Sequence, residues 1–332
     1  MKAKILTLII CLTTLFAFAE NGANHSYKYS TKRTIDANFE VSDSSSISLI
    51  GKFSDYKIST WNENFVSFHI EIIANADKQE KANEMLYVID VDFNNNKNKK
   101  NITAETVIKK HNIKNVSFQI SYHVMVPQYI SLSIYNLYGD VLMDEAHNNL
   151  YVEMKYGDFS IDEILTYAEI NMLYGDANIK KANQISAYVS YGDINVANMN
   201  KASINMNYGS AKLDAVNILN GKFNYSDIVL GNVAQSADID INYCDAKVSN
   251  MSDSFELIKM NTNYSDIELH LDEKLSFSYD ITLLYGEIKS DMLEKHARKI
   301  TEKNYQKHIS GNINDEEQQH KIVIKGNYSE VE

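Results

Sequence analysis

The alternation of apolar and polar positions repeats along the chain from about residue 135 to residue 290. Each repeat is marked by a tyrosine, then a small residue, then usually an acid. The nine tyrosines are spaced 18, 18, 17, 17, 17, 18, 21 and 21 residues apart: Tyr138, Tyr156, Tyr174, Tyr191, Tyr208, Tyr225, Tyr243, Tyr264 and Tyr285. A fixed period of this length predicts an architecture of stacked repeats.

Within a repeat, apolar residues alternate with polar ones on both sides of the tyrosine. Ile204 and Met206 precede Tyr208 by four and two positions, and Ala211 and Leu213 follow it by three and five. Alternation with a period of two predicts half-buried strands. A further apolar residue usually lies eight positions after the tyrosine. We therefore expect each repeat to form one coil, with two strands and a third inward contact, that is stable only when stacked on its neighbours.

Two positions of the repeat support the stacking. The position three after the tyrosine alternates between alanine and isoleucine, as neighbouring coils that interdigitate require. The position directly after the tyrosine is Gly, Ser or Cys. Glycine there could indicate a positive φ, but Ser226, Cys244 and Ser265 favour a small side chain at a tight corner. We interpret Cys244 as a substitute for Gly or Ser rather than as a reactive thiol.

The pattern divides the chain into four parts. Residues 1–19 have the basic start, apolar run and small-residue end of a signal peptide that is cut before Glu20. Residues 20–130 are β-rich, with one short helix from Asp77 to Tyr87 that carries Ala82, Met85 and Leu86 on one face, and we expect this segment to cap the first coil. Residues 131–290 form the β-solenoid of about nine coils. Residues 291–332 are predicted to be a partly helical insertion and a final coil, cornered at Tyr328, that caps the other end.

Charge and composition limit the classes of molecule that the protein can bind. The formal net charge is −12, and it becomes −14 when Lys2 and Lys4 leave with the signal peptide. An acidic chain of this kind disfavours nucleic acid and anionic membranes as partners. No second long apolar run follows the first, so we expect no transmembrane segment in the mature chain. The predicted location is the periplasm, the outer-membrane surface or the exterior.

The acids after the tyrosines are the sharpest candidates for chemistry, and stacking would align them as a surface ladder: Asp140, Asp158, Asp176, Asp193, Asp227, Asp245, Asp266 and Glu287. One carboxylate per coil is few for a calcium site, which takes six to eight oxygen ligands. We therefore favour corners in which the acid bonds to backbone N–H groups. We predict no catalytic residues, no metal and no cofactor. For the tyrosine column we favour a core stack or an edge-lining row over a sugar-binding platform.

The layout resembles a bacterial family of unknown function known by the label "putative adhesin". The features that carry the resemblance are the strand and corner from Ile47 to Asp55, Trp61, the strand from Tyr122 to Val126 before Pro127, and the Tyr-Gly-Asp coils. The resemblance implies a single-stranded, right-handed parallel β-helix, that is, an all-β solenoid. The family label implies adhesion. Coils of 17 or 18 residues leave little room for the loops that build a catalytic cleft, so we predict a non-enzymatic, adhesin-like envelope protein with a protein or glycan partner. The alternatives are a polysaccharide-acting β-helix enzyme and a periplasmic scaffold in envelope stress signalling.

Overall fold

The computed structural model describes residues 27–95, 101–272, 274–314 and 320–332. The predicted signal peptide lies outside the described residues. The chain divides into two compact units, one up to Ile161 and one from Asp162 onward, and each is described by itself.

The first unit contains the first coils of the predicted β-solenoid. Its coils place one strand in each of two facing layers, and strands of neighbouring coils pair in parallel, β2 with β8 and β8 with β10. The register sets Leu49 beside Ile134 and Ile134 beside Val152, and all three side chains are fully buried. The strands are β2 (Ser46–Lys52), β3 (Ser54–Trp61), β8 (Ser131–Leu137), β9 (Val141–Ala146), β10 (Leu150–Lys155) and β11 (Phe159–Leu173), the last continuing into the second unit.

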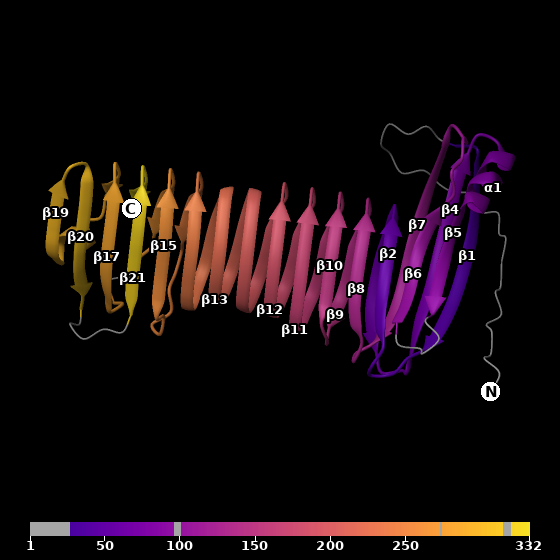
Figure 1. Ribbon diagram of the computed structural model, residues 1–332, viewed down its shortest axis with the longest axis horizontal. Coiled ribbons are helices and arrows are strands. Elements are labelled where there is room, and N and C mark those ends of the chain that lie inside the picture. Colours follow the sequence, from indigo (N-terminus) through magenta and orange to yellow (C-terminus); the bar gives the residue numbers. More distant parts are fainter. Residues whose placement is uncertain (1–26, 96–100, 273, 315–319) are drawn as a thin grey trace. The chain divides into compact units, whose positions relative to one another are not determined.

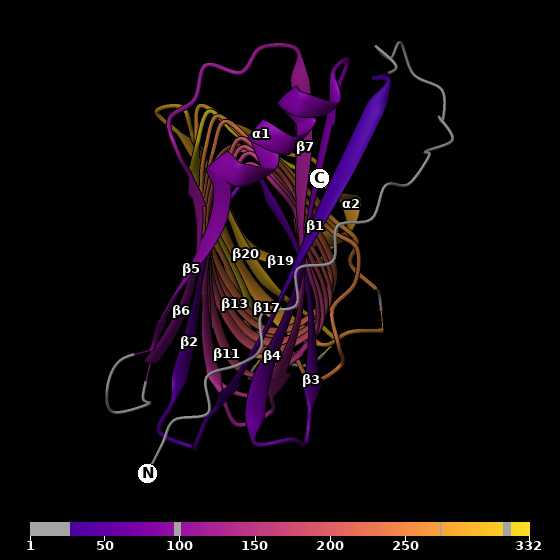
Figure 2. The ribbon, with the colours of Figure 1, turned by 90° about the vertical axis from the view of Figure 1, so that its right-hand side faces the viewer.

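Antiparallel strands and one helix close the open end of the first coil. β4 pairs with β1 and β7 in one layer, and β5 pairs with β6 in the other. Helix α1 (Gln79–Val88) lies between β5 and β7 (Figure 2) and buries Ala82, Met85 and Leu86, as the sequence predicts. Its bounds differ from the predicted ones by one or two residues. The capping strands are β1 (Tyr29–Glu40), β4 (Phe65–Ala76), β5 (Ile89–Asn95), β6 (Asn101–Ile108) and β7 (Val116–Pro127).

The second unit continues the parallel stacking. The alternation of small and large inward residues is confirmed, because Ala177 pairs with Ile194 and Ala246 pairs with Ile267, and all four side chains are buried. The inward residues eight positions after the tyrosines, such as Val216 and Val233, are buried as well. The parallel strands are β12 (Ala177–Ser190), β13 (Ile194–Asn242), β14 (Asp245–Val248), β15 (Leu257–Asn263), β16 (Asp266–Leu269), β17 (Phe277–Leu284), β18 (Glu287–Ile288), β21 (Lys321–Asn327) and β22 (Glu330–Val331).

The prediction that the last coil caps the end of the stack is wrong. β21 pairs in parallel with β15 on one side and with β17 on the other, so the final coil lies inside the stack (Figure 1). The chain reaches this slot after forming an antiparallel extension of β17, built from β20 (Gln306–Ile313) and β19 (Ala297–Lys303). The open edge is therefore β19, which carries Arg298, Lys299 and Lys303, and charged residues of this kind protect an edge strand from pairing with other chains.

Only a short segment of the partly helical insertion predicted within residues 291–332 is helical. Helix α2 covers Asp291–Lys295, and Ser290 caps it by accepting a hydrogen bond from the Leu293 N–H. Leu293 is buried, whereas Ile300 lies on β19 with 53% of its surface exposed. The chain turns to strand after Lys295 because β20 offers a pairing edge, which a propensity argument from local sequence does not include.

The internal position of β21 predicts a large effect of one buried side chain. Ile324 is fully buried between Met260 of β15 and Ile281 of β17. We expect Ile324→Ala to lower the free energy of unfolding by about 2–4 kcal/mol, measured by urea denaturation. The outward neighbour supplies a matched control, since Lys325→Ala should change it by less than about 0.5 kcal/mol. Equal, small effects of the two variants would contradict the internal position.

Candidate functional surface at the tyrosine corners

The tyrosine itself makes each corner. All nine repeated tyrosines, and Tyr328, have positive φ angles between 51° and 61°. A single residue in this left-handed region turns the chain sharply, at a cost that glycine would avoid. Among the described glycines only Gly139 has a positive φ, at 144°, so the residue after the tyrosine is small because the corner is tight, as Ser226, Cys244 and Ser265 indicate.

The tyrosine rings form stacked rows at the surface. In the first unit Phe53, Tyr138 and Tyr156 stack with ring centroids 4.9 Å apart. In the second unit Tyr174, Tyr191, Tyr208, Tyr225, Tyr243, Tyr264, Tyr328, Tyr285 and Tyr305 stack in that order at 4.7–5.1 Å. Between 40% and 50% of each repeated tyrosine is exposed. The column is therefore an edge-lining row. It cannot serve as a sugar platform along its length, since each ring covers the face of the next.

The small residue after the tyrosine permits the close approach of neighbouring corners. A Cβ added to Gly192 would lie 2.1 Å from the carbonyl oxygen of Gly175. Four successive coils carry Ser or Cys instead, and there side chains join the corners: the Ser226 N–H donates to Cys244 Sγ (3.2 Å), and the Cys244 N–H donates to Ser265 Oγ (3.2 Å). Cys244 is buried, and burial raises the pKa of its thiol, so it has a structural role and little thiolate character.

The acidic residues reach from one coil to the next. Oδ1 of Asp140 accepts a hydrogen bond from the Asp158 N–H (2.9 Å), and Oδ1 of Asp176 accepts one from the Asp193 N–H (2.8 Å). Asp193 in turn accepts from the Ser210 N–H (2.8 Å). The Asp245 N–H lies 3.4 Å from Asp227 Oδ1, a longer and weaker contact. These carboxylates thus bond to backbone across the coil interface.

Stacking also brings like charges together. Asp245 pairs with Asp266 in the parallel register of β14 and β16, and Asp227 lies on its other side. The pKa of Asp245 is raised, first by burial and then by the negative charges of Asp227 and Asp266. Within the described ranges, no group of three or more His, Cys, Asp or Glu side chains is arranged to hold a metal ion.

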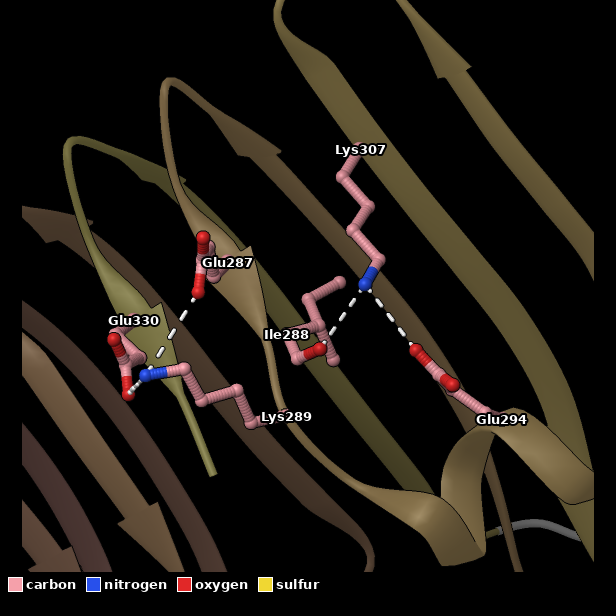
Figure 3. A network of polar contacts seen from close by, with 6 residues as sticks. All are labelled: Glu287, Ile288, Lys289, Glu294, Lys307 and Glu330. Carbon is pink, nitrogen blue, oxygen red and sulfur yellow. Dashed lines mark hydrogen bonds and ion pairs between the residues drawn. The ribbon is translucent and has the colours of Figure 1, made fainter.

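Glu287, the last acid of the column, belongs to a network of ion pairs (Figure 3). Lys289 Nζ lies 3.8 Å from Glu287 and also bonds to Glu330 of the inserted final coil. Lys307 Nζ donates to the Ile288 carbonyl (3.0 Å) and to Glu294 (3.2 Å). The network therefore fastens β22 and β20 to the coil cornered at Tyr285.

A polar groove, which we call the carboxamide groove, borders the tyrosine row of the second unit. Its volume is about 920 Å³. One wall consists of the residues directly before the tyrosines, namely Asn242, Asn263, Asn327, Leu284 and Asn304. The next outward row adds Asp240, Asn261, Lys325 and Thr282, and Gln306 pairs with Leu284. Asn261 Nδ2 donates to Asp240 Oδ1 (2.7 Å). The sequence analysis did not single out this groove, although an asparagine before the tyrosine recurs at residues 207, 224, 242, 263 and 327.

The asparagine row continues beyond the groove. Asn224 Nδ2 donates to Asn207 Oδ1 (3.1 Å), and Asn242 Nδ2 donates to Asn224 Oδ1 (3.0 Å). A side-chain amide has two donors and an acceptor with two lone pairs, so each asparagine in such a ladder keeps hydrogen-bonding capacity toward solvent. The surface beside the tyrosines therefore presents repeated donors and acceptors at the spacing of the strands.

The arrangement of parallel coils with repeated corners corresponds to a known family, whose model matches residues 77–326, more than half of the chain. The chain belongs to the Toastrack DUF4097 family. This confirms the resemblance to a family of unknown function. No curated protein matches the Toastrack chain.

Solved structures similar to this Toastrack chain include a "putative adhesin" from Bacteroides fragilis, 14% identical, with a TM-score of 0.42 over 71% of this chain and 97% of that one. Another "putative adhesin", from Parabacteroides merdae, is 11% identical, with a TM-score of 0.41 over 72% of this chain and 96% of that one. In the described part of the Toastrack chain, neither helix has the length and apolar character needed to cross a membrane.

The hydrogen bond of Asp193 predicts how the acidic column tolerates substitution. Asp193→Ala leaves the Ser210 N–H without its partner and should lower the free energy of unfolding by about 1 kcal/mol. Asp193→Asn keeps an oxygen acceptor and should cost less than half of that. Millimolar calcium should leave the melting temperature of both variants and the parent unchanged. A rise with calcium that Asp193→Asn weakens would instead support a cation-neutralised ladder.

The raised pKa of Asp245 predicts a stability change with a defined pH dependence. Because its pKa is higher in the folded state than in the unfolded state, the folded chain binds more protons between the two values, and this contribution to stability is lost as pH rises through them. Asp245→Asn should therefore raise the free energy of unfolding at pH 7 by only about 0.2–0.5 kcal/mol, since Asp245 is exposed and solvent screens the repulsion. This gain in stability should disappear at pH values below the ordinary pKa of a carboxyl group.

Two controls separate this repulsion from other effects. Asp253→Asn removes an exposed carboxylate outside the column and should change stability at pH 7 by less than the Asp245 variant does. In 1 M salt the gain from Asp245→Asn should shrink, since the Debye length falls to about 3 Å. Destabilisation by Asp245→Asn at pH 7 would show that hydrogen bonding outweighs the repulsion.

Proposed function

We propose that this protein is an exported, non-enzymatic, adhesin-like envelope protein that binds a glycan along the carboxamide groove. The proposed export rests on the signal-peptide pattern of residues 1–19. The mature chain would then meet its partner in the periplasm, at the outer-membrane surface or outside the cell.

The carboxamide groove is the observation that carries the proposal. Asn, Thr and Gln side chains line it, and they offer uncharged donors and acceptors like those that sugar hydroxyls bond. Asn261, Asn263 and Thr282 are each only part-buried, so they remain accessible. The adjoining tyrosines present exposed ring edges along the same rim. An extended, hydroxyl-rich chain fits this repeating surface better than a compact ligand does.

The acidic column supports a binding role over an enzymatic one. The alternative of a polysaccharide-acting enzyme needs a pair of carboxylates with distinct protonation states facing one substrate. Here the carboxylates of Asp140, Asp176 and Asp193 accept backbone hydrogen bonds from the next coil. That arrangement fixes the corners and directs the oxygens along the stack.

A glycan array followed by calorimetry with the retained glycan tests the proposal. We expect Asn263→Ala combined with Asn327→Ala to weaken binding by roughly tenfold, because two hydrogen bonds of ordinary strength are lost. Far-ultraviolet circular dichroism should be unchanged, since both side chains face outward.

The matched control combines Asn178→Ala with Asn195→Ala, which removes an asparagine pair of the same kind (3.0 Å) that does not line the groove. This control should leave the affinity unchanged. Equal losses in the two double variants would contradict binding at the groove. If the unmodified protein captured another envelope protein but bound no glycan on the array, the result would favour the alternative of a periplasmic scaffold.

A further inference from the structure

The first unit contains a second groove, formed where the series of corners is interrupted. β6 pairs in parallel with β2, and β7 pairs in parallel with β3, so β6 and β7 take the place of a coil beside the first coil. Between them, residues 109–115 form a loop, whereas the other described coils turn at Phe53 or at a tyrosine with positive φ. The aromatic row of this unit therefore ends at Phe53, with no further ring stacked on it in the same manner.

The space left by this loop is an open groove of about 670 Å³, which we call the lysine groove. Phe53 and Phe118 contribute its apolar surface, and their rings meet nearly perpendicular at 88° with centroids 5.8 Å apart. Phe53 is 41% exposed. Lys52 Nζ lies 5.6 Å from the centroid of the Phe53 ring. An apolar floor with cations beside it suits a ligand that has both a flat body and a charge.

Three lysines of the groove lack a counterion within the described residues. Lys52, Lys109 and Lys110 are exposed and line the groove together. Among the residues that the structure describes, none of the three forms an ion pair with a carboxylate. Several lysines elsewhere are paired, such as Lys180 with Asp162 (2.6 Å) and Lys247 with Glu268 (2.7 Å).

This clustering is notable in a chain of net charge −12. Three unpaired cations around one groove repel one another, and an anion placed among them relieves that repulsion. The rest of the acidic chain opposes a long polyanion such as a nucleic acid, whose flanking charges would extend beyond the groove. A short anion gains from the lysines without meeting the acidic surface.

We propose that the lysine groove binds a small organic anion, a carboxylate or sulfonate attached to a flat ring-shaped body. The ring packs against Phe53 and Phe118, and the anionic group lies among Lys52, Lys109 and Lys110. The site is separate from the carboxamide groove, and the proposal does not depend on the proposed function.

Fluorescence titration with 8-anilinonaphthalene-1-sulfonate, an aryl sulfonate, tests this on the full mature chain. We expect binding at one site per chain, weakened by added salt, and weaker binding of the uncharged analogue N-phenyl-1-naphthylamine. Lys109→Glu with Lys110→Glu should weaken binding of the sulfonate at least about tenfold, since charge-assisted contacts are lost. The same pair should leave binding of the uncharged dye nearly unchanged.

The control pair Lys201→Glu with Lys222→Glu makes the same change in net charge on the second unit and should preserve the affinity for the sulfonate. If the variant with Lys109→Glu and Lys110→Glu does not fold, as judged by circular dichroism, Lys109→Gln combined with Lys110→Gln removes the two charges without reversing them. Equal binding of both dyes, equal losses in both glutamate pairs, or no binding of the sulfonate would each overturn the proposal.

Discussion

Each coil must place its corner directly on the corner of the next, and the rest of the structure depends on that constraint. A tyrosine in the left-handed region costs roughly 1–2 kcal/mol in backbone energy. An offset-stacked aromatic pair contributes about 0.5–1.5 kcal/mol beyond its burial. The rings stack at 4.7–5.1 Å, close to the spacing of strands in a sheet, so ring stacking requires no distortion of the ladder. The strained corner is thus stabilised by its neighbours, which an isolated coil lacks.

In-register stacking has opposite effects on different columns. It lets Asp140 and Asp193 accept hydrogen bonds from the backbone of the next coil. It also sets Asp245 between two other acids and raises its pKa. At the small-residue position it excludes a Cβ over Gly175, yet four later corners accommodate Ser or Cys through side-chain bonds between coils. In each column, favourable and unfavourable contacts arise only between neighbouring coils, so the sequence of a single coil does not show them.

The period and the inward positions could be predicted from the sequence because they follow from alternation, and Ala82, Met85 and Leu86 could be assigned to one helix face for the same reason. The conformation of the tyrosine could not be predicted from the sequence. The tyrosine lies an even number of positions after the inward strand residues, which suggests an inward ring, but its positive φ places the ring at the surface. The insertion of β21 between β15 and β17 could not be predicted either. Residues 321–327 have the same pattern whether the coil is internal or terminal, and only long-range pairing decides between the two.

The interruptions of the repeat explain where binding capacity remains. In the middle of a stack, ring faces are covered and carboxylates accept backbone hydrogen bonds, so the repeated features mostly satisfy one another. The lysine groove exists because a loop at 109–115 replaces a corner. The carboxamide groove lies where the inserted β21 places Lys325 in the row of Asp240, Asn261 and Thr282, and where the antiparallel β20 places Gln306 beside Leu284. Within each unit the regular coils satisfy one another's polar groups, and departures from the repeat leave chemically distinct surfaces.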